Sequence, residues 1–290
     1  MPFVTSDGQT EAGTSRTAEV EGTTVHYHEV GTGEPIIFLH SYGPGSNAWI
    51  TWHKVLPYFS QRYRCILMDL ANYGRTGPIV FNEPIHNVHA RLARGLMDTL
   101  GIDQAHIIGN SQGGQTAFVF AYLYPDRVLK MVWGAGHIGT NYGYRNEYLL
   151  AVEPEQGGAA AKLAHDNPTW ENFRNYLALH IWDQSLVTDE LVDYVRSTHL
   201  ADPEIRAAGD QSVSVPYDHS AGLASVQAPN LIIWGRNDRM CLVEIAINAL
   251  NITPGSRLVI LRDTGHWVPF ERPEEYAGHV MTFLAGYARP

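Results

Sequence analysis

The pentapeptide Gly109-Asn110-Ser111-Gln112-Gly113 is the stretch of the 290-residue chain that most strongly predicts its fold. An apolar, strand-like run at 105–108 precedes it, and a helical pattern at 115–124 follows it. A nucleophile in so tight a turn from strand to helix has a strained backbone, so the residues two before and two after it must be small. Gly109 and Gly113 meet this need. We therefore predict that Ser111 is a nucleophile at the end of a β-strand, with an ordinary glycine–serine turn as the alternative.

Short β-branched runs alternate with longer amphipathic runs on both sides of this turn. Runs that predict strands lie at 20–30, 35–39, 63–70, 105–108, 128–133, 230–235 and 257–261. Helical patterns lie between several of them, for example at 87–100, where Val88, Leu92, Leu96 and Leu100 share one face. This alternation is typical of a parallel sheet with crossover helices.

The alternation stops at 137–219, where strand-like runs are absent and short helical patterns are separated by prolines. We predict that this segment is a helical lid inserted into an α/β core formed by 17–136 and 220–290. Ligands bind at the carboxyl edge of open α/β sheets, so such a lid would cover the site. Residues 1–16 are rich in Thr, Ser, Gly and acidic residues and predict a flexible tail without a targeting signal.

A serine nucleophile needs a base, and the base needs an acid that orients it. With this kind of turn, the three follow one another along the chain in the order Ser, Asp, His. Asp238 comes shortly after the run at 230–235, and His266 shortly after the run at 257–261. Both therefore fall at the same edge of the sheet as Ser111. We predict that Asp238 orients His266 and that His266 is the base for Ser111.

Other assignments of these roles remain open. Asp238 could instead cap a helix, and His266 could lie in an ordinary surface loop. His137 is the nearest rival base, but it stands where the predicted lid begins. Asp263 is the rival acid, but it is only three residues from His266 and better suits a role in shaping that loop.

Acyl-transfer chemistry also needs two backbone N–H groups directed at the developing oxyanion. The residue after the nucleophile, Gln112, is expected to supply one. The turn at 40–45, His-Ser-Tyr-Gly-Pro-Gly, follows another predicted strand and is expected to supply the other through Tyr42. His40 is interpreted as a buried support for this turn rather than a proton carrier.

The composition limits the classes of partner. Twenty Lys and Arg residues against 30 Asp and Glu residues give a formal charge of −10. This charge argues against nucleic acid or an anionic membrane surface as the main partner, but it permits a small anionic substrate held by a local arginine. The longest apolar run, at 117–124, is too short to span a bilayer.

Two cysteines, Cys65 and Cys241, are too few for a disulfide framework, and we interpret them as buried thiols of a cytoplasmic protein. His26 and His28 lie on one face of a predicted strand without a third ligand nearby in the sequence, so no metal site is expected. No glycine-rich loop for a phosphate is evident either, and we predict no cofactor.

These features together resemble the α/β-hydrolase superfamily and, within it, the meta-cleavage product hydrolases, which cut carbon–carbon bonds in aromatic ring-fission products. The resemblance covers nearly the whole chain after residue 16. It rests on the glycine–proline turn at 40–45 and on four further motifs: Gly109-Asn110-Ser111-Gln112-Gly113-Gly114, Trp234-Gly235-Arg236-Asn237-Asp238-Arg239, Gly265-His266-Trp267 and, in the lid, Asp183-Gln184-Ser185-Leu186-Val187-Thr188. It implies a mostly parallel eight-stranded sheet with flanking helices and an inserted lid.

The resemblance also implies a reaction. The substrate would be a vinylogous 1,5-diketone, a 2-hydroxy-6-oxo-dienoate, that is anionic and derived from an aromatic compound. Ser111 would add to the distal ketone after ketonisation of the dienol, with His266 as base and Asp238 orienting it. Water would then release the acid product. The family also implies a homodimer or a larger homo-oligomer.

By the same likeness, Asn110, Trp267 and Gly43 would line the pocket, and a lid arginine would pair with the substrate carboxylate through its planar fork. The arginine here is Arg196, which falls one residue late: Val195 stands at the position that aligns with the family's arginine. One residue on a helix turns a side chain by about 100°. A solvated surface position for Arg196 is therefore the alternative.

Two further departures lie in the turn at 40–45 and further along the chain. Ser41-Tyr42 stands where the family usually has glycines, and Thr51 stands where some members have an asparagine. They leave room for an ester, lactone, amide or carbamate hydrolase with the same three residues, and for a ligand sensor on this scaffold. Hydrolases of this fold with a carboxylate nucleophile are disfavoured because the nucleophile position holds Ser111.

Overall fold

The computed structural model describes residues 3–138 and 155–286 of the chain. Its centre is an eight-stranded sheet with the strand order β1-β2-β4-β3-β6-β7-β9-β10. The strands are β1 (Ser15–Val20), β2 (Thr23–Val30), β3 (Glu34–Leu39), β4 (Tyr63–Met68), β6 (Ala105–Asn110), β7 (Val128–Gly134), β9 (Asn230–Gly235) and β10 (Ser256–Leu261). β2 runs antiparallel to β1 and β4, and the other neighbours are parallel. The predicted sheet and its order along the chain are confirmed.

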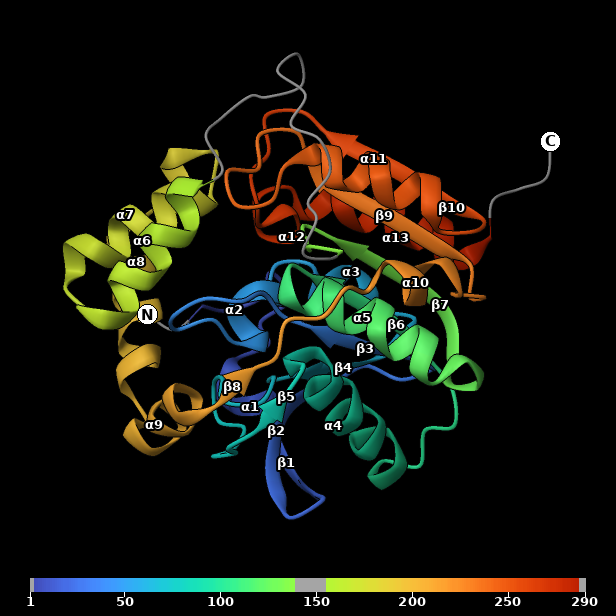
Figure 1. Cartoon of the computed structure of the whole chain (residues 1–290), viewed down its shortest axis with the longest axis horizontal. Helices are drawn as coiled ribbons and strands as arrows, with labels where there is room; N and C mark the ends of the chain where they lie inside the picture. Colours follow the sequence, from blue (N-terminus) through green and yellow to red (C-terminus); the bar gives the residue numbers. More distant parts are fainter. Residues whose placement is uncertain (1–2, 139–154, 287–290) are drawn as a thin grey trace.

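Helices cover both faces of this sheet (Figure 1). One apolar cluster joins alternate strand residues to α4 (Ile85–Thr99), α5 (Gln112–Leu123) and α11 (Val243–Ile252). A second cluster joins the remaining strand residues to α2 (Ala48–Trp52), α3 (Leu56–Phe59) and α13 (Pro273–Ala285). The strands are apolar on both sides because both faces are buried, which is why they read as continuous apolar runs in the sequence.

The helices in the described part of segment 137–219 lie along one side of the molecule, and the chain after them runs from β8 across the core to α10 (Figure 1). It contains α6 (Glu155–Asp166), α7 (Trp170–His180), the short 3₁₀ helix η2 (Gln184–Leu186), α8 (Asp189–Leu200), α9 (Pro203–Gln211) and the two-residue strand β8 (Val213–Ser214). β8 pairs with β5 (Asn82–Glu83) of the core, a pairing that the sequence did not indicate. A third apolar cluster joins the lid helices to Ile50, Trp267 and Phe270 of the core.

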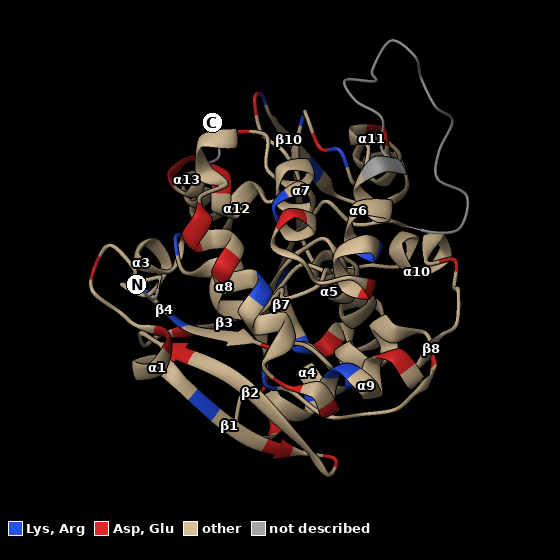
Figure 2. Ribbon diagram, turned by 90° about the vertical axis from the view of Figure 1, so that its left-hand side faces the viewer, with Lys and Arg blue, Asp and Glu red and all other residues tan. Residues whose placement is uncertain are grey.

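Shorter helices complete the described chain: α1 (Glu11–Thr14), η1 (Pro125–Arg127), α10 (Ser220–Ala224) and α12 (Val268–Glu271). None of the helices in the described residues has the length and the apolar character needed to cross a membrane. On the side shown in Figure 2, Lys and Arg positions are interspersed with Asp and Glu positions along the lid helices and the β1–β2 hairpin.

The N-terminal segment differs from its prediction as a flexible tail. The Phe3 carbonyl accepts a hydrogen bond of 2.9 Å from the Trp49 indole. Thr14 is buried, and its hydroxyl lies 3.0 Å from His28 Nδ1. β1 already begins at Ser15, inside the predicted tail. The polar composition hid these contacts, because one aromatic anchor and a few hydroxyl groups are enough to hold the segment against the core.

Candidate active site

Ser111 occupies a strained turn between β6 and α5. Its backbone has φ +56° and ψ −121°, a combination that costs a non-glycine residue energy and persists only where the surroundings enforce it. The Ser111 N–H donates to the Gly134 carbonyl at 2.8 Å. A Cβ at Gly109 would collide with the Gly113 carbonyl, and a Cβ at Gly113 with the Leu39 carbonyl. The close approach of these backbones explains why glycine flanks the serine on both sides.

Asp238 and His266 follow β9 and β10 and form a buried pair. His266 Nδ1 lies 2.9 Å from Asp238 Oδ2 and 3.0 Å from Oδ1, and the two side chains are almost fully excluded from solvent. Asp238 Oδ1 also accepts hydrogen bonds from the backbone N–H groups of Met240 (2.7 Å) and Cys241 (2.9 Å). Because a carboxylate only accepts, the proton lies on Nδ1, and Nε2 of the neutral ring is left as the basic nitrogen.

The contact between Ser111 and His266 is not closed. Within the described chain, Ser111 Oγ forms no hydrogen bond with the His266 ring. The His266 ring instead has an edge contact with the His180 ring of α7, at 5.1 Å between centroids. The backbone N–H of His266 donates to the backbone carbonyl of His180 at 2.8 Å. The hydrogen bond between a nucleophilic serine and its histidine base is often long without substrate and shortens when substrate binds. The lid helix α7 therefore takes part in placing the base.

The rival residues are placed differently. His137 Nε2 lies 3.3 Å from the Cys241 thiol, and burial lowers its pKa to about 4. Asp263 lies in an exposed turn with φ +53°, and its carboxylate is 3.7 Å from the Arg262 guanidinium. Of the candidate acids and bases considered for Ser111, Asp238 and His266 are the two that hydrogen-bond to each other in the described structure.

Asn110, expected to line the pocket, connects three parts of the site. Its amide nitrogen donates to Ser41 Oγ at 2.8 Å and to the His266 carbonyl at 3.2 Å. The residue thus joins the turn with Ser111 to the glycine–proline turn and to the histidine loop. His40 supports the glycine–proline turn from within, as expected, since its ring contacts the Ser41 carbonyl (2.7 Å) and accepts from the Leu70 N–H (2.9 Å).

Gln112 and Tyr42, the predicted oxyanion donors, lie at the start of α5 and in the glycine–proline turn. Gln112 is the first residue of α5, and Tyr42 precedes Gly43, whose φ of +129° favours glycine. Two lid helices hold this turn. The Tyr176 hydroxyl of α7 lies 3.4 Å from the Tyr42 carbonyl, and the Val195 carbonyl of α8 is so close to Gly45 that a Cβ there would collide with it.

Glu271 is a buried part of the site that the sequence did not reveal. Its carboxylate accepts hydrogen bonds from the N–H groups of Gly265 (2.9 Å), Trp182 (2.9 Å) and Asp183 (3.2 Å). Burial raises the pKa of Glu271 to about 7, against the opposing effect of these hydrogen bonds. The residue ties the lid to the loop that carries His266. Its position in an acidic, proline-rich stretch gave no sign of this role.

Arg196 does not reach the site, contrary to its predicted role. Its Nε atom donates to the Pro168 carbonyl at 2.7 Å. Val195 is instead the α8 residue that is buried against the glycine–proline turn. The prediction is wrong because the helix turns neighbouring side chains by about 100°. Trp267, by contrast, is fully buried between lid and core, with its ring 5.9 Å from that of His180.

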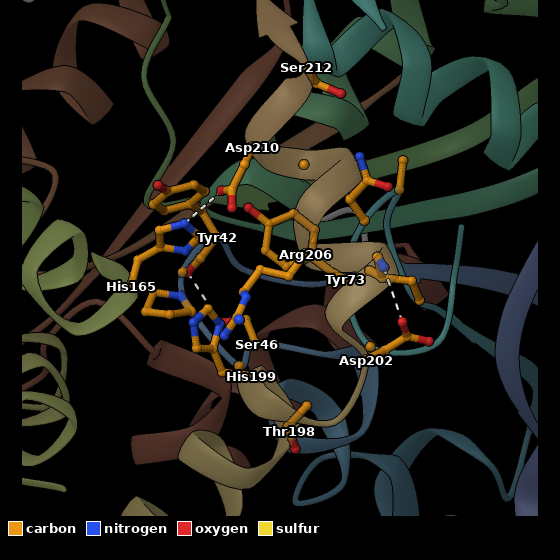
Figure 3. Close-up of a pocket in the computed structure, with 18 of the residues that line it drawn as sticks. Tyr42, Ser46, Tyr73, His165, Thr198, His199, Asp202, Arg206, Asp210 and Ser212 are labelled. Carbon is orange, nitrogen blue, oxygen red and sulfur yellow. Dashed lines mark hydrogen bonds and ion pairs between the residues drawn. The ribbon is translucent and has the colours of Figure 1, made fainter. Parts of the chain in front are cut away.

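A cavity of about 480 Å³ opens beside the glycine–proline turn (Figure 3). It is lined by the turn itself, including Tyr42 and Gly43, and by residues of α6, α8 and α9. Ser111 and His266 are not among its lining residues. The cavity therefore adjoins the reactive residues through the turn that is expected to hold the oxyanion.

Arg206 of α9 is the notable cation of this cavity. Figure 3 shows its side chain extending toward Ser46 and His199. Lys162 and His165 of α6 also line the cavity and pair with Asp166 (2.5 Å) and Asp210 (2.8 Å), whereas Arg206 has no ion pair within the described residues. The sequence gave no motif that would single it out.

His199 offers a second polar group beside Arg206. Burial, with the nearby charges of His165 and Arg206, lowers the pKa of His199 to about 4. Its Nε2 atom is buried and has no hydrogen-bond partner within the described residues. A cation and an unsatisfied ring nitrogen in one cavity suit an anionic ligand.

Comparison with known proteins decides the family. The model of the alpha/beta hydrolase fold family matches residues 34–273, most of the described chain and all of the residues above from Tyr42 to His266. The chain belongs to the α/β-hydrolase family. It therefore shares the fold that the turn at Ser111 predicts.

The similar proteins narrow this assignment. Over 287 residues the hydrolase is 32% identical to the 2-hydroxy-6-oxononadienedioate/2-hydroxy-6-oxononatrienedioate hydrolase of Burkholderia vietnamiensis, covering 95% of this chain and 97% of the relative. It is 30% identical to the 2-hydroxy-6-oxo-6-phenylhexa-2,4-dienoate hydrolase of Comamonas testosteroni, covering 95% and 98%. A solved meta-cleavage product hydrolase of Pseudomonas fluorescens IP01 has 26% identity and a TM-score of 0.79, covering 93% and 97%. The predicted likeness to meta-cleavage product hydrolases is confirmed.

Proposed function

We propose that this hydrolase cleaves a carbon–carbon bond in a 2-hydroxy-6-oxo-dienoate with Ser111 as its nucleophile. The observation that carries the proposal is the buried His266–Asp238 pair, at 2.9 Å, in a chain with a strained serine turn. Relatives that are at least 30% identical over most of the chain are named hydrolases of such dienoates. Both parts are needed, since the three residues alone serve many hydrolases.

The residues have defined tasks in this reaction. The substrate first ketonises by moving its enol proton to C5. His266 Nε2 then takes the Ser111 hydroxyl proton while Oγ adds to the C6 carbonyl, and the N–H groups of Gln112 and Tyr42 stabilise the oxyanion. The C5–C6 bond breaks because the departing carbanion is a stabilised dienolate, which recovers a proton from His266. Water, activated by the same ring, hydrolyses the acyl ester on Ser111.

The substrate carboxylate requires a partner other than Arg196. Among the described residues Arg206 forms no ion pair, and it lines a cavity that begins at the glycine–proline turn. A substrate with its ketone against this turn would reach into the cavity with its charged end. An arginine fork suits a carboxylate because it forms two parallel hydrogen bonds.

A second candidate is a hydrolase of esters, lactones, amides or carbamates. The observation that favours it is the orientation of Arg196 toward Pro168, with the uncharged Val195 against the turn. An uncharged acyl compound needs no carboxylate partner near the nucleophile. The acyl-enzyme chemistry of Ser111 and His266 would be the same.

A cytoplasmic location suits either activity. Its support is that Cys65 and Cys241 are both buried and free. Assembly into a homodimer or a larger homo-oligomer is a further expectation from the family resemblance, and size-exclusion chromatography with light scattering tests it.

The two candidates separate in one kinetic comparison. The wild-type enzyme is assayed with the coloured dienolate of 2-hydroxy-6-oxo-6-phenylhexa-2,4-dienoate and with p-nitrophenyl acetate. The proposal predicts a kcat/KM for the dienoate that exceeds that for the ester by about 10²-fold or more, since remote binding energy is used only with the matching substrate. Turnover of the ester alone would contradict it in favour of the second candidate. Tight binding of the dienoate without turnover of either compound would indicate a ligand sensor.

A further inference from the structure

A second serine, histidine and aspartate are linked by hydrogen bonds at the other end of the sheet. Ser15 Oγ lies 2.8 Å from His26 Nε2, and His26 Nδ1 lies 2.7 Å from Asp69 Oδ2. In the antiparallel register, His26 of β2 is opposite Thr17 of β1. Ser15, two residues from Thr17, is on the same face of the strand and is the diagonal neighbour of His26.

We call Ser15, His26 and Asp69 the second relay. Its histidine and aspartate are held in the same way as the His266–Asp238 pair. Asp69 accepts hydrogen bonds from two backbone N–H groups, those of Ala48 (2.8 Å) and Arg75 (3.1 Å), as well as from His26. Burial raises the pKa of Asp69, but the hydrogen bond from His26 and the nearby histidines outweigh it and hold the pKa at about 2. The carboxylate is therefore ionised at neutral pH and places the ring proton of His26 on Nδ1.

The direction of the third hydrogen bond follows from this tautomer. In the neutral form of the ring, with its proton on Nδ1 toward Asp69, His26 Nε2 accepts and the Ser15 hydroxyl donates to it. Ser15 Oγ keeps its lone pairs for other contacts, one of which is the Arg75 Nη1 donor at 3.3 Å. A serine whose proton is held by a histidine and whose oxygen faces a cation is activated for attack on a carbonyl carbon.

The serine end of the second relay is nearer to solvent than its buried histidine and aspartate. His26 and Asp69 are 1% and 2% exposed, whereas Ser15 is only partly buried and the Arg75 side chain is 56% exposed. β1 is an edge strand, and β4 and β3 separate β2 from the strand that leads to Ser111. A reagent can therefore approach Ser15 from solvent without entering the cavity beneath the lid.

We propose that Ser15 is a second acyl-accepting nucleophile, acylated by activated carboxylic esters with His26 as its base. Ser15 Oγ forms a bond to the carbonyl carbon while its proton moves to His26 Nε2, and Asp69 stabilises the resulting imidazolium. The tetrahedral adduct then expels the aryloxide, which takes the proton from His26. The products are acyl-Ser15 and the free phenol, so no further reactant is required.

The backbone at Ser15 limits this reaction to slow, stoichiometric acylation. Its φ of −63° and ψ of 132° are ordinary extended values, and Ser15 follows the four-residue helix α1 instead of starting a helix. It therefore lacks the pair of converging N–H groups expected at Gln112 and Tyr42, which in acyl transfer are worth about 10²-fold or more in rate each. Arg75, whose Nη2 also pairs with Glu11 Oε1 at 3.3 Å, supplies one donor near Ser15 Oγ but no such pair.

The test is acetylation of the full chain by p-nitrophenyl acetate in a Ser111→Ala background. Peptide mass spectrometry measures acetyl transfer to Ser15 and, in the same sample, to Ser225. Ser225 is a matched internal control, because it is exposed and its hydroxyl donates to the Gly222 carbonyl at 2.7 Å, with no histidine involved. Base catalysis predicts acetylation of Ser15 about 10²-fold faster than that of Ser225. Adding Ser15→Ala removes the fast acetylation, and adding His26→Gln slows it to the Ser225 rate.

Equal acetylation rates at Ser15 and Ser225, or no acetyl group on Ser15, would overturn the proposal. Fast acetylation that survives His26→Gln would also overturn it. The comparison of the two serines within one protein decides the matter even if His26→Gln fails to fold. Ser15→Ala alone leaves dienoate cleavage unchanged, so failure of this proposal is separate from failure of the proposed function.

Discussion

At the scale of single residues, the strand-end positions of the predicted nucleophile, acid and base could be read from the sequence, whereas the residues that line the cavity and join the lid to the core could not. Ser111, Asp238 and His266 follow strand-like runs in a fixed order, because their chemistry requires them at one edge of the sheet. The surroundings of Arg206 and Glu271 depend on the tertiary structure. Arg206 faces a cavity between helices, and the Glu271 carboxylate accepts hydrogen bonds from backbone N–H groups of a loop that is distant along the chain. No local pattern marks such positions.

Asp238→Asn tests the pair at the centre of the site. The amide fits the same space, but its NH₂ group can donate to His266 and favour the wrong tautomer, so kcat for the dienoate is expected to fall by about 10²- to 10⁴-fold. Asp263→Asn, in an exposed turn, is the matched control and is expected to retain activity. Steady-state kinetics measures both. An Asp238→Asn enzyme with nearly wild-type kcat would exclude Asp238 as the orienting acid.

Arg206→Gln tests the charged end of the cavity. Loss of a charge-assisted hydrogen bond of about 1.5–3 kcal/mol is expected to raise KM for the dienoate by about 10- to 100-fold. KM for uncharged p-nitrophenyl acetate should stay the same. Arg196→Gln is the control, because its guanidinium is used by the Pro168 carbonyl. If Arg196→Gln raised KM and Arg206→Gln did not, the carboxylate would bind elsewhere.

At the scale of elements, physical causes explain which strands and segments the sequence predicts and which it does not. The central strands are apolar on both faces, so their runs are continuous and easily recognised. β5 and β8 have only two residues each, too few for any periodicity, and their pairing depends on the lid position. The N-terminal segment was missed for a similar reason, since its contacts through Phe3 and Thr14 are tertiary.

Gly45→Ala tests the contact between the lid and the oxyanion turn. A Cβ at this position, where φ is +75°, would collide with the Val195 carbonyl of α8. The helix or the turn must then shift, and we expect a loss of about 1–3 kcal/mol in unfolding free energy with a marked fall in kcat.

Gly158→Ala in α6 is the matched control, because nothing lies within 4 Å of its added Cβ. It should leave kcat unchanged and keep or slightly raise stability, since alanine favours the helix. Urea unfolding and steady-state kinetics measure both variants. Equal behaviour of the two would show that α8 does not hold the turn.

At the scale of the whole molecule, buried histidines govern the response to acid. Among the described residues, burial lowers the pKa of six of them far below 6.5, to about 4 in five cases and about 3 in the sixth; they are His28, His53, His137, His199, His219 and His86. Their number was visible in the sequence, but their burial follows from the packing of elements that are distant along the chain.

The unfolding free energy is therefore expected to fall by several kcal/mol as the pH drops from 6.5 to about 4. In this range these histidines bind protons in the unfolded chain but stay neutral in the folded chain, so acid favours unfolding. Glu271 acts in the opposite direction, since its folded pKa of about 7 lies above the unfolded value, but it is a single group. Urea titrations at pH 7 and pH 4.5 measure the difference. Equal or greater stability at pH 4.5 would contradict the neutral, buried state of these histidines.

The central claim is that Ser111 drives hydrolysis of a carbon–carbon bond. Its most direct test is product analysis by chromatography and mass spectrometry after incubation with 2-hydroxy-6-oxo-6-phenylhexa-2,4-dienoate. The wild-type enzyme should convert each equivalent into one of benzoate and one of 2-hydroxypenta-2,4-dienoate. Ser111→Ala should leave the compound intact while still binding it, with turnover reduced by about 10³-fold or more. Intact substrate with the wild-type enzyme, or the same products at the same rate with Ser111→Ala, would contradict the account.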